Sequence, residues 1–374
     1  MKKDKMGSFV FAHQWMICMR SVMALMVFFS LFACSATRKL PANEKLYIGA
    51  KVRIDDEDIK AKKEKALEKE LESLVRPKPN KSFLGIRYKL MFYNMVDSVG
   101  RKRGLKHFIK NKLGEPPVLF SDVSLEANEE IICNRLQNRG YFDTRCSSDI
   151  KERDRKVKVI YTAKPGPQYH IRKVDFKVDS LSVLGSAVKE TEDHTFLKPR
   201  DSYDLDIIKA ERERIDARLK ENGFYFFAPD DILVQVDSTV GENQVDLFVR
   251  LKESTPTKAR KVYHINNTYI FPDYSISDDE VDISQAEKHF NFYITDPEDK
   301  WKPLTFRHFV YFNPGDVYNR TDHNIAISNM VSIGAFKFVK NKFVETGDSA
   351  RLNVFYFLTP FPKKSIRAEI SGRK

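Results

Sequence analysis

The sequence predicts an α+β protein made of three tandem β-α-α-β-β modules. A helical stretch that ends in glycine and leads into aromatic residues occurs three times along the chain. Each of these glycines is followed by two segments of alternating polar and apolar residues. Glycine-terminated helices and strands with one buried face have these patterns. We therefore expect three small sheets, each carrying helices, in place of one large core.

The repeated helix has the same kind of start and end in each copy. An aromatic residue and a short polar side chain precede it, in Phe120-Ser121, Tyr203-Asp204 and Tyr318-Asn319. Such polar side chains accept hydrogen bonds from the free N–H groups of a first helical turn. The helices are expected to end at Gly140, Gly223 and Gly334.

Strands are expected on both sides of these helices. Each module opens with a strand, at residues 45–54, 169–178 and 261–270. Two closing strands follow each glycine, at residues 141–150 and 156–162, 231–237 and 244–251, and 336–343 and 351–358. A further helix is expected before the repeated one, at residues 58–75 and 180–190.

The composition excludes several classes of protein. Of the 374 residues, 42% are hydrophobic and 31% are charged, which excludes collagen-like and wholly disordered chains. The mean hydropathy of −0.46 excludes a protein with several membrane-spanning helices. The formal charge of +12 would suit a nucleic-acid partner. The N-terminus argues against that partner.

Residues 1–33 have the features of a secretory signal peptide. Lys2, Lys3, Lys5 and Arg20 precede an apolar run of about a dozen residues, which is short for a membrane span. The run ends in Leu31-Phe-Ala-Cys34, which resembles the lipobox of bacterial lipoproteins. We expect cleavage between Ala33 and Cys34 and acylation of Cys34, with an uncleaved signal anchor as the alternative. Two or three acyl chains hold a protein stably on a membrane.

The residue after Cys34 indicates in which membrane the lipoprotein is placed. Ser35 stands where an aspartate would signal retention in an inner membrane, and residues 35–39 hold no acidic cluster. We expect the periplasmic face of an outer membrane, attached through the lipid anchor. No nucleic-acid partner is expected there.

The order of elements resembles the POTRA module, the periplasmic repeat of the Omp85 superfamily of barrel assembly and translocation factors. A leucine four residues before glycine, followed by an aromatic residue, carries this resemblance and occurs at Leu136–Tyr141 and Leu219–Phe224. Three modules behind a lipidated cysteine resemble the TamL group, the lipoprotein relatives of TamA. The segment Tyr311–Tyr318 resembles the entry to the module nearest the barrel.

The resemblance implies a division of the chain. It comprises the signal peptide 1–33, a tether 34–43, a first POTRA-like module 44–164 with a basic insertion 76–117, a second 165–254, a third 255–359 with an insertion 272–303, and residues 360–374 as a linker or start of a barrel. The smallest barrels have eight strands, so no complete transmembrane barrel is expected in this chain. A fragment of a longer protein and a tethered periplasmic arm both fit.

The basicity is concentrated in the first insertion. Between Arg76 and Lys112 lie eleven Lys or Arg residues and one acid, Asp97. Aromatic residues are interleaved with them, as on a surface that contacts anionic lipids. The candidate contacts are Arg87, Lys89, Arg101, Lys102, Arg103 and Lys106. A packed insertion with a solvated basic face is the other interpretation.

Cys133 and Cys146 are candidates for a disulfide. The periplasm permits one, and closing a 13-residue interval would contribute about 3 kcal/mol. Cys133 lies in an apolar helical run, so a small core residue is the alternative. Residues 272–303 hold nine acids without the spacing of a calcium loop, so a solvated loop is expected.

No pattern indicates catalysis. The eight histidines are scattered, and no HExxH, GxSxG or P-loop motif occurs. We expect no enzymatic activity, no cofactor and no metal.

The expected function is binding. A small sheet leaves an edge strand with unpaired N–H and C=O groups, to which an extended segment can add. The candidate edges are residues 141–149, 231–237 and 336–343. By resemblance, the partners are a TamB-like periplasmic protein and nascent outer-membrane barrel proteins. A lipid-anchored adaptor that binds no client, or a component of lipid transport, is the alternative.

Overall fold

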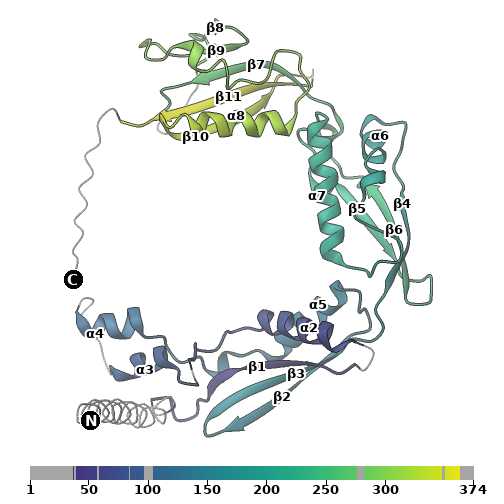
Figure 1. Ribbon diagram of the computed structural model, residues 1–374, viewed down its shortest axis with the longest axis vertical. Helices are drawn as coiled ribbons and strands as arrows, with labels where there is room; N and C mark the ends of the chain where they lie inside the picture. Colours follow the sequence, from purple (N-terminus) through teal and green to yellow (C-terminus); the bar gives the residue numbers. More distant parts are fainter. Residues whose placement is uncertain are drawn as a thin grey trace, which may run out of the picture. The chain divides into compact units, whose positions relative to one another are not determined.

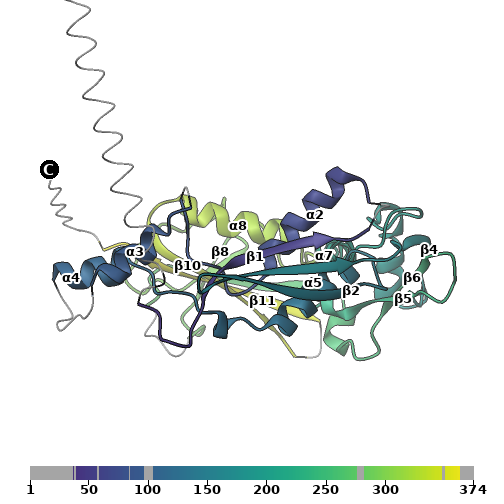
Figure 2. The same ribbon diagram turned by 90° about the horizontal axis from the view of Figure 1, so that it is seen from below.

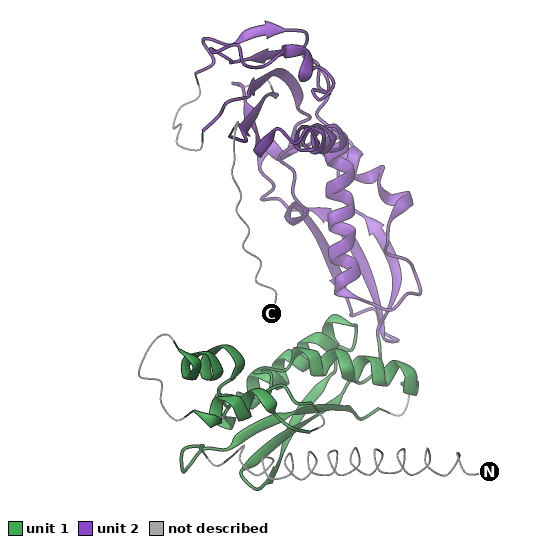
Figure 3. Cartoon of the chain, turned by 60° about the vertical axis from the view of Figure 1, so that its left-hand side comes forward, with its two compact units in different colours: residues 1–168 green, residues 169–374 purple. Residues whose placement is uncertain are grey.

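The computed structural model describes residues 37, 39–56, 59–83, 85–96, 104–275, 282–347 and 350–362. The predictions for Ala33, Cys34 and residues 101–103 lie outside these ranges. The chain forms two compact units, residues 1–168 and 169–374 (Figure 3). Among the described residues, no helix combines the length and apolarity needed to cross a bilayer.

The first unit contains one three-stranded sheet with the order β1-β3-β2. β3 pairs parallel with β1 and antiparallel with β2. Helices α2 and α5 lie on the same side of this sheet (Figure 1). Its elements are β1 (Leu46–Ile54), α2 (Ala61–Leu74), α3 (Tyr88–Met95), α4 (Leu105–Phe108) with a π-helical turn (Ile109–Leu113), α5 (Leu125–Asn138), β2 (Arg145–Arg153) and β3 (Lys156–Lys164).

The second unit contains two further sheets, with the orders β4-β6-β5 and β10-β11-β7-β9-β8. Its elements are β4 (His170–Phe176), α6 (Val183–Lys189), α7 (Leu205–Glu221), β5 (Ile232–Asp237), β6 (Gln244–Leu251), β7 (His264–Phe271), β8 (Glu287–His289), β9 (Phe292–Ile294), α8 (Arg320–Ser332), β10 (Phe336–Glu345) and β11 (Arg351–Pro360).

The three sheets repeat one topology. The last strand lies between the opening strand, which pairs parallel with it, and the penultimate strand, which pairs antiparallel with it. A parallel pair requires a crossover, which the intervening helices provide. We refer to β1–β3, β4–β6 and β7–β11 as the first, second and third modules. The predicted fold class of three tandem α+β modules is confirmed.

The last strand of each module shows why alternating polar and apolar residues in the sequence predict a sheet with one buried face. In β11, the side chains of Leu352, Val354, Tyr356 and Leu358 have no solvent exposure. These residues pack against Met330 and Ala326 of α8 in one hydrophobic core. Apolar residues at every second position of a strand lie on the same face of the sheet. The alternation therefore identifies the face that the helix covers.

The third module differs in the segment between its opening strand and its repeated helix. β8 and β9 occupy part of this segment and extend the sheet at the side of β7. The expectation of a solvated loop over residues 272–303 is therefore wrong for residues 287–294. Phe292 and Ile294 are buried in the module core, and burial of these side chains favours the added strands. The acidic residues 278–280 lie outside the described ranges.

Candidate partner-binding strand edges

The opening strand of each module is partly covered at its outer side. The aromatic residue before each repeated helix donates its backbone N–H to the carbonyl just before the opening strand. These N···O distances are 2.8 Å for Phe120 to Lys45, 2.9 Å for Tyr203 to Tyr169 and 2.9 Å for Tyr318 to Tyr263. The sequence pattern of these aromatic residues predicted only the start of a helix. Their recurrence at one position was the available signal for this second role.

The penultimate strands are not covered in this way. β2, β5 and β10 each stand at the end of their sheet and pair with one neighbour within the described residues. Each presents a row of backbone groups without a ladder partner on its outer side. These are the strands at the three sequence-predicted edges, with β2 beginning at Arg145, four residues later than expected.

β10 is the longest of these edges. It has ten residues, against nine in β2 and six in β5. The face of β10 that points away from the module core contains Phe338 and Val344, with exposed fractions of 48% and 37%. The same face holds Lys340 and Lys342, whose ladder partners in β11 are Phe357 and Phe355. β2, by contrast, has only Ile150 as an exposed large apolar side chain.

The register determines which backbone groups of β10 face outward. Thr346 donates its N–H to the carbonyl of Arg351 at 2.9 Å, directly beyond the β10–β11 ladder. Hydrogen-bonded and non-hydrogen-bonded pairs alternate in an antiparallel ladder. The even-numbered residues from Phe338 to Val344 therefore bond to β11. The N–H groups of Val339, Asn341 and Phe343 point to the open edge.

Helix α8 positions β10 from the covered face of the sheet. Phe343 packs against Tyr318 and His323, with ring centroids 5.4 Å and 4.7 Å away. Asn341 donates its side-chain amide to Nε2 of His323, and Nδ1 of His323 lies 3.1 Å from the hydroxyl of Tyr318. Burial lowers the pKa of His323, and the positive charge of the nearby Arg320 lowers it further.

The far end of β10 is held by a buried tyrosine. The hydroxyl of Tyr263 donates to Oε1 of Glu345 at 2.8 Å. Burial raises the pKa of Tyr263, and the hydrogen bond and charge of Glu345 raise it further. The phenol therefore stays protonated and keeps donating at physiological pH, so the C-terminal half of the edge strand is fixed to the module core.

The predicted membrane contacts have different surroundings within the described ranges. The Arg87 guanidinium is half-buried and donates to the carbonyl of Ile48 in β1 at 3.1 Å. Burial lowers the pKa of Arg87. Lys89 is partly exposed and Lys106 is exposed. Arg87 therefore attaches the insertion to the sheet, while Lys106 lies at the surface.

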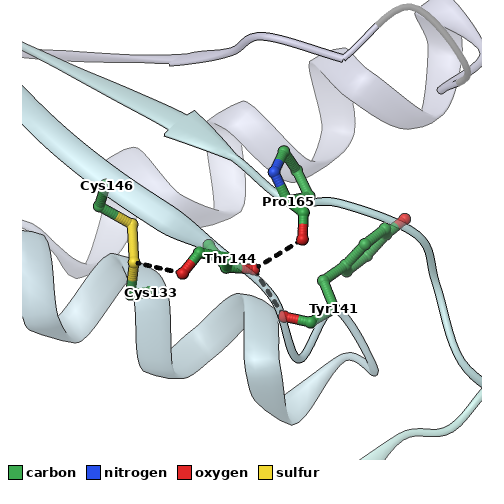
Figure 4. The surroundings of a disulfide bond; sticks show 5 residues. All are labelled: Cys133, Tyr141, Thr144, Cys146 and Pro165. Atoms are coloured by element: carbon green, nitrogen blue, oxygen red, sulfur yellow. Dashed lines mark hydrogen bonds between the residues drawn. A yellow bond between two sulfur atoms is a disulfide. The ribbon is translucent and has the colours of Figure 1, made fainter.

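The structure joins Cys133 of α5 to Cys146 of β2, with an Sγ–Sγ distance of 2.16 Å and a Cα–Cα distance of 6.0 Å (Figure 4). Thr144 lies beside this bond. Its hydroxyl donates to the carbonyls of Tyr141 at 2.6 Å and Pro165 at 3.2 Å. The end of α5, the start of the edge strand β2 and the end of β3 are therefore connected.

The described residues contain no group of three or more His, Cys, Asp or Glu side chains arranged to hold a metal ion. What the edges offer is backbone hydrogen bonding together with apolar and basic side chains.

No known protein-family profile and no curated protein matches this sequence. The chain is similar to POTRA domains 3–5 of BamA from Haemophilus influenzae, at 13% identity and a TM-score of 0.42, over 86% of this chain and 99% of that one. It is also similar to POTRA domains 1–3 of Omp85 from Anabaena, at 14% identity and a TM-score of 0.27, over 86% and 97% of the two chains. The N-terminal domain of Omp85 from Thermosynechococcus elongatus follows at 11% identity and a TM-score of 0.25, over 84% and 98%. Two of these solved structures are thus POTRA domains, of BamA and of the periplasmic domain of Omp85, and the third is the N-terminal domain of an Omp85 protein.

Proposed function

We propose that this chain is the periplasmic arm of a lipid-anchored assembly or translocation factor of the outer membrane, akin to the TamL group. It binds extended segments of nascent barrel proteins, or of a TamB-like periplasmic partner, by strand addition. Acylated Cys34 holds it at the periplasmic face of the outer membrane. The arm acts by binding, and no chemical step is assigned to it.

The observation that carries this proposal is the open edge of β10. Its outward N–H groups at Val339, Asn341 and Phe343 follow from the β10–β11 register. An added strand would gain main-chain hydrogen bonds there irrespective of its own sequence. Clients that differ in sequence but share an extended backbone suit such an edge.

Side chains beside the edge limit which strands can add. Phe338 and Val344 are exposed on the outer face and would contact alternate apolar side chains of a client. Lys340 and Lys342 lie between them on the same face. Lysines on an edge oppose pairing of two copies of this strand. They also favour neutral or acidic client segments over basic ones.

β10 also has the length of its proposed client. A transmembrane β-strand has about 9–11 residues, and β10 has ten. Full pairing is therefore possible along one membrane strand. The six residues of β5 would pair with little more than half of such a strand.

Binding of barrel-strand peptides to the mature chain tests the proposal. The protein is residues 34–374 with Cys34→Ser, so that acylation plays no part, and the probe is a fluorescent peptide with alternating apolar and polar residues. A scrambled peptide of the same composition is the control. We expect saturable binding of the alternating peptide, measured by anisotropy, and weak binding of the scrambled one.

The variant Val339→Pro removes one outward N–H without removing a β10–β11 hydrogen bond. One lost hydrogen bond and the steric obstacle of the ring should weaken binding at least about tenfold. Val339→Ala keeps the N–H and should bind as the parent does. Equal binding by the two variants would exclude the β10 edge. Absence of peptide binding in the parent would favour a lipid-anchored adaptor that binds no client.

A further inference from the structure

The insertion of the first module presents apolar side chains to solvent. α3 and α4 lie near the beginning of β1, away from α2 and α5 (Figure 2). The exposed fractions of Leu105 and Phe83 are 75% and 69%. The exposed large apolar residues of this segment, here called the insertion surface, are Phe83, Tyr88, Met95, Leu105, Phe108 and Leu113. Six such side chains on one short segment exceed what scattered surface exposure requires.

The exposure results from how α3 attaches to the sheet. Leu90 is fully buried and packs with Leu46 of β1. At 100° per residue, Tyr88, Phe92 and Met95 lie on the side of α3 opposite Leu90. One face of α3 therefore packs against the module, and the opposite face, which carries Tyr88 and Met95, is exposed to solvent. The turn after α4 packs beside it, since Gly114 lies against the backbone of Tyr93.

The insertion is held as a folded part of the module. Asn80 is buried, donates to the carbonyl of Pro116 at 2.7 Å and accepts from the N–H of Val118 at 3.0 Å. One side chain thus joins the two ends of the insertion. Glu115 donates its N–H to the carbonyl of Lys89 at 3.1 Å. The apolar surface is therefore displayed by a fixed scaffold.

The charged residues of this segment are predominantly basic. Lys81, Lys106 and Lys112 are exposed, and Lys89 and Lys110 are partly exposed. Asp97 is the one acidic residue of the sequence between Arg76 and Lys112. Apolar side chains bordered by lysines match an interface of acyl chains and anionic headgroups.

The tether is docked on the same helix. Leu40 is buried against Leu46 and Leu90. The ammonium of Lys39 donates to the carbonyl of Asn94 in α3. Cys34 precedes Lys39 by five residues, which span at most about 18 Å when fully extended. An acyl chain on Cys34 would thus keep α3 within about that distance of the membrane surface.

We propose that the insertion surface binds the surface of a bilayer containing anionic phospholipid. Its apolar side chains enter the interface, and its lysines pair with headgroup phosphates. The tether argument rests on the lipid anchor of the proposed function, whereas the apolar surface and its charge do not. The bound insertion would hold the first module against the membrane.

Vesicle flotation with the unacylated mature chain, residues 34–374 with Cys34→Ser, tests this inference. The vesicles are phosphatidylcholine alone or phosphatidylcholine mixed with phosphatidylglycerol. We expect flotation with the mixed vesicles, little with the neutral ones, and weaker flotation as salt is added. Acylation and client binding are absent from this assay, so its failure is separable from failure of the peptide assay.

Two double variants test the lysines and the apolar side chains of the insertion surface separately. Lys106→Gln with Lys112→Gln should weaken binding to the mixed vesicles about 25-fold at low salt, or about fivefold per lysine. Leu105→Ser with Phe108→Ser should weaken binding at least about tenfold. Leu181→Ser with Lys198→Gln, at exposed sites of the second module, is the matched control and should leave binding unchanged.

Each other outcome overturns the inference. Equal flotation with neutral and mixed vesicles would exclude recognition of anionic lipid. Equal binding by parent and insertion variants, or an equal loss in the control, would exclude this surface. A parent that floats with neither vesicle would point to a protein partner for the exposed apolar side chains.

Discussion

Tyr225 of the second module packs edge-on against Tyr318 of the third, with ring centroids 4.9 Å apart. Phe226 lies beside it and packs against Tyr263, 5.1 Å away. Both residues follow Gly223 in the repeated motif, and both pack against the core of the next module. Arg320 of α8 adds an ion pair to Asp216 of α7 at 3.3 Å. The second module therefore contributes aromatic side chains and an ion pair to the packing of the third.

Tyr225→Ala should loosen the contact between the second and third modules. The side chain is partly buried among aromatic rings, so a loss of about 2 kcal/mol in the free energy of unfolding is expected. Chemical denaturation would measure it. Leu181→Ala, at a residue with 98% exposure, serves as the control. An equal effect of the two substitutions would show that the aromatic contact contributes nothing.

Both the left-handed backbone and the close approach of neighbouring side chains require glycine at position 223, and the two requirements can be tested separately. Its φ is +92°, and a Cβ there would lie 2.7 Å from Val262 and 2.8 Å from Val317. Gly241 has a similar φ of +84° with nothing within 4 Å of a Cβ. Gly241→Ala should cost about 1 kcal/mol for the left-handed backbone alone. Gly223→Ala should cost clearly more, and equal midpoints in urea would contradict the close approach at the junction.

The burial and hydrogen bonds of His323 predict that the stability of the third module depends on pH. With Asn341 donating to Nε2, the proton of the neutral ring lies on Nδ1 and is donated to Tyr318. Protonation would place an N–H against the amide donor. Burial lowers the pKa of His323 in the folded state, whereas the unfolded value is about 6.5. The stabilisation is therefore complete above about pH 6.5 and is lost as the pH falls toward the folded pKa.

Thermal unfolding at about pH 7.5 and about pH 5.5 would measure this loss. His323→Gln keeps a polar side chain but cannot titrate, so it should reduce the difference between the two temperatures. His194, on a short turn of the second module, supplies the control His194→Gln. Identical pH dependence in the parent and H323Q would exclude a role for His323.

Much of the fold could be predicted because its pattern is local. The alternation in β3, β6 and β11 and the glycine at the end of each repeated helix are visible along the chain. β8 and β9 were missed because each has only three residues, too few for an alternating pattern. Their strand conformation depends on pairing with β7, which is a tertiary contact.

The candidate site was predictable only in part. The sequence indicated the strands that form the edges, but the outward N–H groups of β10 depend on register with β11. The insertion was recognised as basic and aromatic. That Arg87 binds the carbonyl of Ile48 while Lys106 remains exposed depends on contacts 39 residues apart. Such distant contacts have no local signature.

Glu211 is a buried structural residue that sequence reasoning missed. It has no solvent exposure and accepts hydrogen bonds from the N–H of Phe196, the hydroxyl of Thr195 and the guanidinium of Arg214, at 2.7–2.9 Å. Burial raises the pKa of its carboxyl, but these hydrogen bonds, that of Arg214 foremost, outweigh burial and lower the pKa overall. α7 is thereby tied to the loop that precedes it.

Glu211→Gln should destabilise the second module by about 2 kcal/mol, because the amide cannot accept all of these bonds and brings a donor of its own. The lowered pKa means that the stabilisation is present above the unfolded value of about 4.3 and is lost as the pH falls through the folded pKa. Urea denaturation at neutral pH measures the first effect. Glu213→Gln, at an exposed position two residues away, should have little effect.

The Cys133–Cys146 bond should stabilise the first unit and leave the second unit unchanged. It closes an interval of 13 residues, for which chain entropy predicts a contribution of about 3 kcal/mol. The bond joins α5 to the edge strand β2, while the second unit is a separate compact body. Replacing both cysteines by alanine should therefore lower the unfolding transition of the first unit, and reductant should lower it in the parent but not in the variant. Intrinsic fluorescence reports mainly on the second unit, since Trp301 lies there, and its transition should stay in place. A matching shift in both transitions would mean that the two units unfold together, whereas no shift in either would show that the bond adds nothing beyond packing of the two side chains.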